Sequence, residues 1–366
     1  MKKIFIIFLF ILVIGCQERE KDQNIIIKKP TKITKTVKRE EEIKRAWIKS
    51  GKKPSYKPLV FRTYDIIYNK GIIYRGTSLG LIVEKIESFE KEPQRLQEIL
   101  LPGSINHLFF LPEYSLLFAF NGPEGFFEFK VNEDGKLEMI SSINEIRGAA
   151  ISGKFYKDNL IVAEGSGGLS FYKLKEGGVE LLGNLDIEGY VRDIEFDKGI
   201  GYLALSEKGI GIINIESTIQ SLKRGGESKD SVKIVPIEGE ARDIELFYND
   251  NELYLAVANG YKGITILKGE ELEKVWEEKS SDRARVVKIF KNILLVGIGP
   301  DGILSYDISD PLKPKLLDKK MFRLAVIGIT LVPETNYLLC AYDSGGLLTL
   351  KIDEKGKFYK LYSMKE

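Results

Sequence analysis

Histidine, cysteine and tryptophan are scarce in this chain of 366 residues, which holds one His, two Cys and two Trp. One histidine cannot supply a multi-histidine metal site, and it leaves no strong candidate for a Ser-His-Asp triad. His107 stands beside the apolar residues 108–111, so we interpret it as a structural residue at the start of a strand. We therefore expect no metal, no cofactor and no catalytic residue.

Disulfide bonds are excluded if the first of the two cysteines is modified. Cys16 lies at the end of an N-terminal apolar segment, and Cys340 lies within the apolar residues 337–342. If Cys16 is modified, no second cysteine remains in the chain to form a disulfide bond with Cys340. We expect Cys340 to be an inert thiol in the core.

The N-terminus carries an apolar run that is too short to cross a membrane. Residues 4–14 are all apolar, follow Lys2 and Lys3, and end at Gly15-Cys16. A bilayer core needs about 20 such residues, whereas this order of basic, apolar and small residues is that of an export signal. The sequence Val13-Ile14-Gly15-Cys16 resembles the lipobox of bacterial lipoproteins. The resemblance implies cleavage before Cys16 and attachment of acyl chains such as palmitate, whereas an ordinary secretory signal with an incidental cysteine is the alternative.

Charge divides the chain into two parts. Residues 1–57 hold 16 Lys and Arg against 6 Asp and Glu, which leaves 39 basic and 47 acidic residues in 58–366. The basic segment is either attracted to anionic lipids or wall polymers, or merely soluble and extended. The acidic remainder argues against nucleic-acid binding. We predict a signal peptide at 1–15, a lipid-anchored linker at 16–57 and a folded domain at 58–366.

Within 58–366, one unit of apolar strands repeats seven times around a tight glycine turn. Each turn joins the second strand of a unit to the third and ends on a glycine, namely Gly80, Gly125, Gly168, Gly209, Gly263, Gly302 and Gly346. The spacings of 45, 43, 41, 54, 39 and 44 residues match the length of a four-stranded propeller blade. We predict an all-β, seven-bladed β-propeller of antiparallel blades.

The sixth unit shows the strands most clearly, at 285–290, 293–298, 303–308 and 315–321. Its apolar runs are nearly continuous, as expected for sheets that are covered on both faces. The long fourth spacing contains the polar residues 220–230, which we predict to be an exposed loop between the third and fourth strands. Residues 358–362 read as a last fourth strand, and residues 56–61 as an extra outer strand.

The sixth unit also carries a motif of a known family. The residues Asp307-Ile308-Ser309-Asp310-Pro311 follow Gly302-Ile303-Leu304-Ser305-Tyr306, and Arg192-Asp193-Ile194 and Arg242-Asp243-Ile244 open two other units. These segments resemble the repeats of LVIVD-repeat proteins, bacterial and archaeal surface propellers. The resemblance implies an exported propeller and transfers no catalytic residue.

One arginine stands just before or within the first strand of six of the seven units. These are Arg62, Arg147, Arg192, Arg242, Arg285 and Arg323. First strands lie nearest the axis of a propeller, so we expect the six side chains to gather at one channel mouth. They either hold a carboxylate or phosphate ligand, or pair with carboxylates such as Asp193 and Asp243 and join neighbouring blades.

Three functions follow from these features. The first is a non-catalytic binding or scaffold module, anchored by Cys16 in the bacterial envelope, for a protein or an anionic envelope ligand. We favour attachment at the outer membrane over the outer face of the inner membrane. The second is a lactonase-like propeller hydrolase, against which the recurrent arginines count. The third is a role in an envelope assembly complex, which differs from the first only in the partner.

Overall fold

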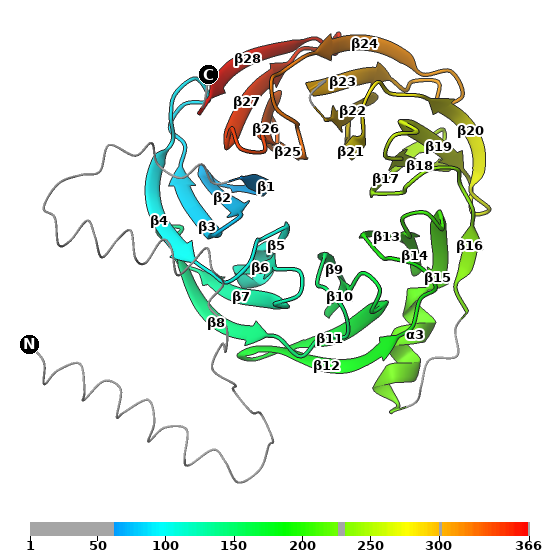
Figure 1. The fold of residues 1–366 in the computed structure, drawn as a ribbon. Helices are drawn as coiled ribbons and strands as arrows, with labels where there is room; N and C mark the ends of the chain where they lie inside the picture. The colour runs from blue at the N-terminus through cyan, green and yellow to red at the C-terminus, as the bar shows by residue number, and fades with distance from the viewer. Residues whose placement is uncertain (1–61, 226–230, 300–301, 365–366) are drawn as a thin grey trace, which may run out of the picture. The chain divides into compact units, whose positions relative to one another are not determined.

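The computed structural model describes residues 62–225, 231–299 and 302–364. They form seven sheets of four antiparallel strands around a common axis, so the predicted seven-bladed β-propeller is confirmed (Figure 1). The signal peptide, Cys16, the basic linker and the extra strand predicted at 56–61 lie outside the described residues. No helix among the described residues is long and apolar enough to cross a membrane.

Each blade is one continuous stretch of chain, with its first strand nearest the axis and its fourth at the outer rim (Figure 1). Blade 1 contains β1 (Thr63–Asn69), β2 (Ile72–Thr77), β3 (Gly80–Lys85) and β4 (Gln94–Leu100). Blade 2 contains β5 (His107–Leu111), β6 (Leu116–Phe120), β7 (Phe126–Val131) and β8 (Leu137–Ile143), with the short 3-10 helix η1 (Pro112–Tyr114) after β5. Blade 3 contains β9 (Ser152–Tyr156), β10 (Asn159–Ala163), β11 (Leu169–Lys175) and β12 (Gly178–Leu185). Blade 4 contains β13 (Asp193–Asp197), β14 (Ile200–Ala204), β15 (Ile210–Asn214) and β16 (Lys233–Val235).

The remaining three blades follow the same order. Blade 5 contains β17 (Asp243–Asn249), β18 (Glu252–Ala258), β19 (Ile264–Lys268) and β20 (Glu273–Glu278). Blade 6 contains β21 (Ala284–Phe290), β22 (Ile293–Ile298), β23 (Gly302–Asp307) and β24 (Lys315–Lys320), which lie within one residue of the predicted bounds. Blade 7 contains β25 (Gly328–Leu331), β26 (Tyr337–Ala341), β27 (Leu347–Ile352) and β28 (Phe358–Ser363), the predicted last strand.

The seven marker glycines are required by both conformation and space. All seven have a positive φ, between 78° and 126°. At Gly125, for example, a Cβ atom would lie 1.9 Å from the carbonyl oxygen of Ile143 in the fourth strand. Five other marker glycines have a fourth-strand carbonyl oxygen within 2.4 Å of the same position. Only glycine fits such a position, which explains the periodicity of the sequence.

The predicted loop at 220–230 is wrong in part. The insertion does lie between the third and fourth strands of blade 4, but it begins with helix α3 (Ile215–Lys223). The Asn214 side chain caps the helix by accepting a hydrogen bond from the Ser217 amide. The buried positions Ile215, Thr218, Ile219 and Leu222 form one helical stripe. The stripe begins at Ile215, so the segment 220–230 contains only its last residue, Leu222.

The core lies between the blades. Seven clusters of buried apolar residues occupy the seven interfaces between neighbouring blades. Blades 7 and 1 close the ring in the same way, through a cluster that includes Ile66, Ile73 and Leu339. Among the described strands, none is exchanged across this seam. The Thr63 amide donates to the Asp343 carbonyl at 2.9 Å, and Thr349 Oγ1 donates to the Phe89 carbonyl at 2.5 Å.

Candidate anion-binding site

The turns between second and third strands share one face of the propeller, here called the glycine-turn face, with the segments that lead into the first strands. Backbone bridges join such a turn to the next blade at five interfaces, for example between Gly165 and Val191 and between Ser206 and Ala241. Five of the six predicted arginines lie within three residues of such a bridge. The repeat therefore brings these arginines to the glycine-turn face.

Arginines from blades 4, 5 and 6 gather around one carboxylate, that of Glu240. Arg192 Nη2 lies 2.8 Å from Glu240 Oε1, and Arg242 Nη1 lies 2.5 Å from the same oxygen. Arg283 Nε lies 3.9 Å from Glu240 Oε2. Arg285 is near enough to Arg242 to act on it electrostatically. We call these five residues the Glu240 cluster, in which four positive groups surround one negative group.

The excess of positive charge in the cluster affects the pKa of Arg242. The pKa of this guanidinium is lowered to about 10, mainly by burial and in addition by the charges of the neighbouring arginines, while Glu240 acts in the opposite direction. The Nε atoms of Arg283 and Arg285 are buried and have no hydrogen-bond partner. A second anion at this site would reduce the repulsion between the arginines.

Two tyrosines support the guanidinium groups. The guanidinium of Arg192 lies 5.0 Å from the ring centre of Tyr190, and that of Arg283 lies 4.6 Å from the ring centre of Tyr261. Arg192 Nε also donates to Ser206 Oγ at 2.6 Å. The Tyr261 side chain is two-thirds exposed. Stacking holds the guanidinium planes in place and leaves an aromatic surface at the mouth of the cluster.

The other three predicted arginines have different surroundings. Arg62 Nε lies 3.4 Å from Asp343 at the seam of blades 7 and 1. Arg147 forms an ion pair with Asp186. Arg323 is exposed, five residues before β25. The structure thus gathers Arg192, Arg242 and Arg285 in one cluster and gives Arg62 and Arg147 acidic partners of their own.

Asp193 and Asp243 join neighbouring blades, but not by pairing with the arginines beside them. Asp193 Oδ2 accepts a hydrogen bond from the Ile244 amide at 3.2 Å, and Asp243 Oδ2 accepts one from the Val287 amide at 2.7 Å. In blade 1, Asp65 Oδ2 accepts one from the Leu108 amide at 2.8 Å. Each of these three aspartates therefore accepts a hydrogen bond from a backbone amide of the next blade.

Further along the first strands, buried ion pairs line the axis. Lys154 pairs with Glu195, and Lys288 Nζ lies 2.5 Å from Glu245 Oε2. Burial raises the pKa of Glu195 to about 7, against the effect of Lys154. Burial also raises the pKa of Asp65 and of Asp243. Within the described residues, no group of three or more His, Cys, Asp and Glu could hold a metal ion.

His107 is the first residue of β5, as predicted. Its Nε2 lies 4.0 Å from Asp65 Oδ2, and burial lowers its pKa although Asp65 opposes this. Cys340 is fully buried in β26, and burial raises the pKa of its thiol to about 12. A thiol with this pKa stays protonated and unreactive at neutral pH, which agrees with the inert core thiol predicted above.

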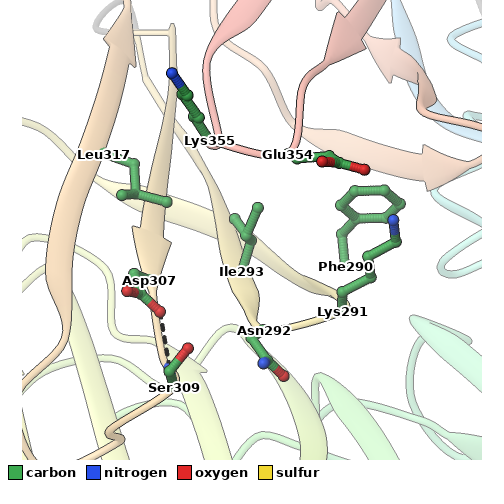
Figure 2. Close-up of a pocket in the computed structure, with 9 residues that line it drawn as sticks. All are labelled: Phe290, Lys291, Asn292, Ile293, Asp307, Ser309, Leu317, Glu354 and Lys355. Carbon is green, nitrogen blue, oxygen red and sulfur yellow. Dashed lines mark hydrogen bonds between the residues drawn. The ribbon is translucent and has the colours of Figure 1, made fainter.

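A pocket of about 580 Å³ lies at the seam of blades 6 and 7. Its lining combines the turn between β21 and β22, the end of β23, one residue of β24 and the turn after β27 (Figure 2). Asp307 and Ser309 of the LVIVD-like segment lie on one side, where Asp307 Oδ1 accepts the Ser309 amide at 2.9 Å. Leu317 and Lys355 also line it. The motif therefore forms one wall of this pocket and terminates β23 with a hydrogen-bonded turn.

Sequence reasoning missed Glu240 and Arg283. Both lie two residues before a predicted arginine, in Glu240-Ala241-Arg242 and Arg283-Ala284-Arg285. Residues two apart in extended chain project to the same side, so this spacing was the available signal. The pairing of Glu240 with arginines from blades 4, 5 and 6 depends on the ring and is not visible along the chain.

The comparisons with known proteins support the fold and show no specific function. A scan against protein-family models and a search of curated proteins found no match. A putative 6-phosphogluconolactonase from Bacteroides fragilis is similar in structure, with a TM-score of 0.66, 12% identity and coverage of 84% of this chain and 95% of that one. Sqt1 from Saccharomyces cerevisiae has a TM-score of 0.62 at 10% identity, covering 82% and 98%. Sqt1 from Chaetomium thermophilum, in a structure bound to the N-terminus of ribosomal protein L10, has a TM-score of 0.61 at 13% identity, covering 85% and 89%.

Proposed function

We propose that this propeller is a non-catalytic binding module whose glycine-turn face recognises an acidic segment of a protein partner. The observation that carries the proposal is the Glu240 cluster, where three arginines share one carboxylate and a fourth, Arg285, adds its charge nearby. An acidic side chain or terminal carboxylate fits the planar donors of Arg283 and Arg285, and Tyr261 offers apolar contact beside them. Arginine and tyrosine are the residues that most often dominate protein interfaces.

Two further observations support a protein partner. Sqt1, a propeller of similar fold, has been captured with a peptide segment of another protein. The domain from residue 58 onward holds more acidic than basic residues, so the cluster is a local region of opposite sign. Local fields of this kind steer charged partners toward one site and weaken as salt is added.

The test uses a fluorescent peptide of ten glutamates as the probe. Arg283→Glu should weaken its binding at least tenfold, because the variant places a second carboxylate beside Glu240. Arg147→Glu is the matched control, since Arg147 lies on the same face and pairs with Asp186 instead. Binding of the parent should also fall between 50 and 300 mM NaCl, chosen as low and high salt. Equal binding by a folded Arg283→Glu variant would rule the site out.

The location that we propose is the bacterial envelope, with acyl chains on Cys16 as the anchor and the outer membrane as the favoured site. The lipobox-like residues before Cys16 and the resemblance to LVIVD-repeat proteins support this part. Cys16→Ala should leave the precursor uncleaved or move the protein into a soluble fraction. Unchanged partitioning of this variant into detergent would contradict the anchor.

A lactonase-like hydrolase is the second candidate. The similarity to a putative 6-phosphogluconolactonase and the carboxylates along the axis favour it. A lactone-hydrolysis screen with added Ca²⁺ and Zn²⁺ separates the two functions. Activity that disappears in Glu195→Gln would establish the hydrolase.

A further inference from the structure

The outer rim of blades 6 and 7 combines exposed apolar side chains with lysines. Five of the large apolar side chains that the described residues expose come from this stretch: Leu312 (47% exposed), Leu316 (51%), Leu317 (39%), Met321 (64%) and Tyr359 (43%). The neighbouring lysines Lys313, Lys315, Lys319, Lys355 and Lys357 are exposed as well. We call these ten residues the blade 6–7 rim.

The structure brings the two halves of this rim together. Strands β24 and β28 follow one another along the outer edge (Figure 1). Asp318 Oδ2 accepts the Phe358 amide at 2.8 Å, which ties β24 to β28. Leu317 packs over Gly356, so that a Cβ at Gly356 would lie 2.4 Å from its Cδ1. Leu317 of blade 6 and Lys355 of blade 7 both line the pocket between these blades (Figure 2).

A β-bulge turns apolar side chains of β24 outward. Ser305 pairs with Asp318 and Tyr306 pairs with Leu316, so Leu317 is the extra residue of the outer strand. An extra residue interrupts the alternation of faces, and here both Leu316 and Leu317 are exposed. Transfer of apolar side chains from water to an apolar environment is favourable. Within the propeller, however, Leu316 and Leu317 stay exposed to solvent.

The charge of the rim selects the kind of surface that covers it. Residues 313–320 contain four lysines and one aspartate, and residues 353–360 contain three lysines with Asp353 and Glu354, so that lysines outnumber acidic residues by seven to three. The carboxylate of Asp318 accepts the backbone amides of Phe358 and Lys319. The rim is therefore basic on a domain that is acidic as a whole.

A second apolar rim on blades 2 and 3 shows what the lysines add. Met139 and Leu181 are exposed there to 45% and 47%. Their neighbours Glu138 and Glu180 are accompanied by Lys136 and Lys175, and Lys175 pairs with Glu180. This rim therefore provides an internal comparison of similar exposure without an excess of lysines.

We propose that the blade 6–7 rim docks on the surface of a membrane that contains anionic lipids. Leu316, Leu317, Met321 and Tyr359 enter the interface, and the lysines contact the headgroups. Each lysine near an anionic surface adds to the attraction, which falls with salt. Contact through the rim leaves the glycine-turn face open, so the docking and the Glu240 cluster are independent and can fail separately.

The test places a tryptophan in the rim of the full-length protein. Met321→Trp is mixed with phosphatidylcholine vesicles containing 30% phosphatidylglycerol and brominated acyl chains, and the parent signal is subtracted. The proposal expects quenching and a blue shift that vanish in pure phosphatidylcholine. Met139→Trp on the rim of blades 2 and 3, which has no excess of lysines, is the matched control and should show neither change.

Charge reversal separates docking by the rim from binding by the N-terminal segment. Lys313→Glu with Lys315→Glu should reduce the quenching of Met321→Trp at least fivefold, because both lysines leave and two carboxylates replace them. An unquenched Met321→Trp, or equal quenching of the two tryptophans, would overturn the proposal. A blue shift that depends on protein concentration without vesicles would overturn it too, since a second copy would then cover the rim.

Discussion

At the scale of single residues, the least expected feature is a buried arginine at the seam that closes the ring. Arg75 and Glu84 are each only 2% exposed and form a bidentate pair, with Nε to Oε2 at 2.8 Å and Nη2 to Oε1 at 2.9 Å. Arg75 Nη1 also donates to Thr63 Oγ1 at 2.9 Å. Thr63 in turn bonds to Asp343 of blade 7. The pair therefore supports the residue that closes the ring.

Arg75→Met should lower the free energy of unfolding by about 3–5 kcal/mol, because the buried Glu84 carboxylate loses its bidentate partner and keeps only Arg95, whose Nη2 lies 3.8 Å from Glu84 Oε1. Urea denaturation measures the change. The double variant Arg75→Met with Glu84→Leu removes both charges and should recover much of the loss. If the single variant is as stable as the parent, the pair does not stabilise the seam.

At the scale of elements, most outer strands share a β-bulge that the sequence did not reveal. Six of the seven fourth strands contain a β-bulge. In each of these six blades, the third-strand residue that pairs just before the bulge lies three positions after the marker glycine. The extra residue is aliphatic every time: Leu96, Ile140, Leu182, Val275, Leu317 and Leu361. Bulges protect exposed edges against pairing with other strands.

Blade 4 is the exception among the described blades. Its outer strand β16 has three residues, and α3 precedes it along the chain. The helix packs on blade 3 through Leu222, whose Cδ2 lies 2.7 Å from where a Cβ of Gly183 would be. A short outer strand limits the exposed edge just as a bulge does.

Leu222→Ala should lower the free energy of unfolding by about 2–4 kcal/mol, because it leaves a cavity between α3 and Gly183. Lys223→Ala, at the exposed neighbouring position, should change stability by less than about 0.5 kcal/mol. Thermal denaturation of the two variants in parallel measures the difference. Equal melting temperatures would mean that α3 does not pack on blade 3 in solution.

At the scale of the whole molecule, the axis couples stability to pH. Glu195 has a pKa of about 7 in the folded state, against about 4.3 in an unfolded chain. The folded state thus binds more protons between these values, so Glu195 makes the free energy of unfolding fall as pH rises through this window. The raised pKa of Asp243 acts in the same direction.

We expect the free energy of unfolding to fall by about 1–3 kcal/mol between pH 5 and pH 8, measured by urea denaturation. Glu195→Gln removes the titrating group and should flatten this dependence. Glu188→Gln is the control, because Glu188 pairs with Lys208 at the surface and has a lowered pKa. A steeper or unchanged slope in Glu195→Gln would contradict the assignment.

Closure of the ring is the second property of the whole molecule. Deleting residues 325–366 removes blade 7 and exposes the apolar residues of blades 6 and 1 that pack against it. The product should be insoluble or should lack cooperative melting, because each blade is stabilised by its neighbours. Calorimetry checks this, and cooperative melting near the temperature of the full-length protein would contradict it.

The sequence by itself determined the number of blades, their order and the strand bounds of the sixth blade. The physical reason is local: each marker glycine occupies a conformation that only glycine fits, and apolar strands are buried on both faces. It also predicted that six arginines gather at one face, and of these the structure brings Arg192, Arg242 and Arg285 into one cluster.

Only the tertiary structure decided which partners these arginines have. Glu240 meets Arg192 because blade 5 follows blade 4 around the ring, and Arg62 meets Asp343 because blade 7 returns to blade 1. Contacts between blades join residues about 40–50 or more positions apart, so no local pattern specifies them. The blade 6–7 rim likewise exists because blade 7 packs against blade 6 and so places β24 beside β28. The Leu and Lys residues of one strand do not reveal that arrangement.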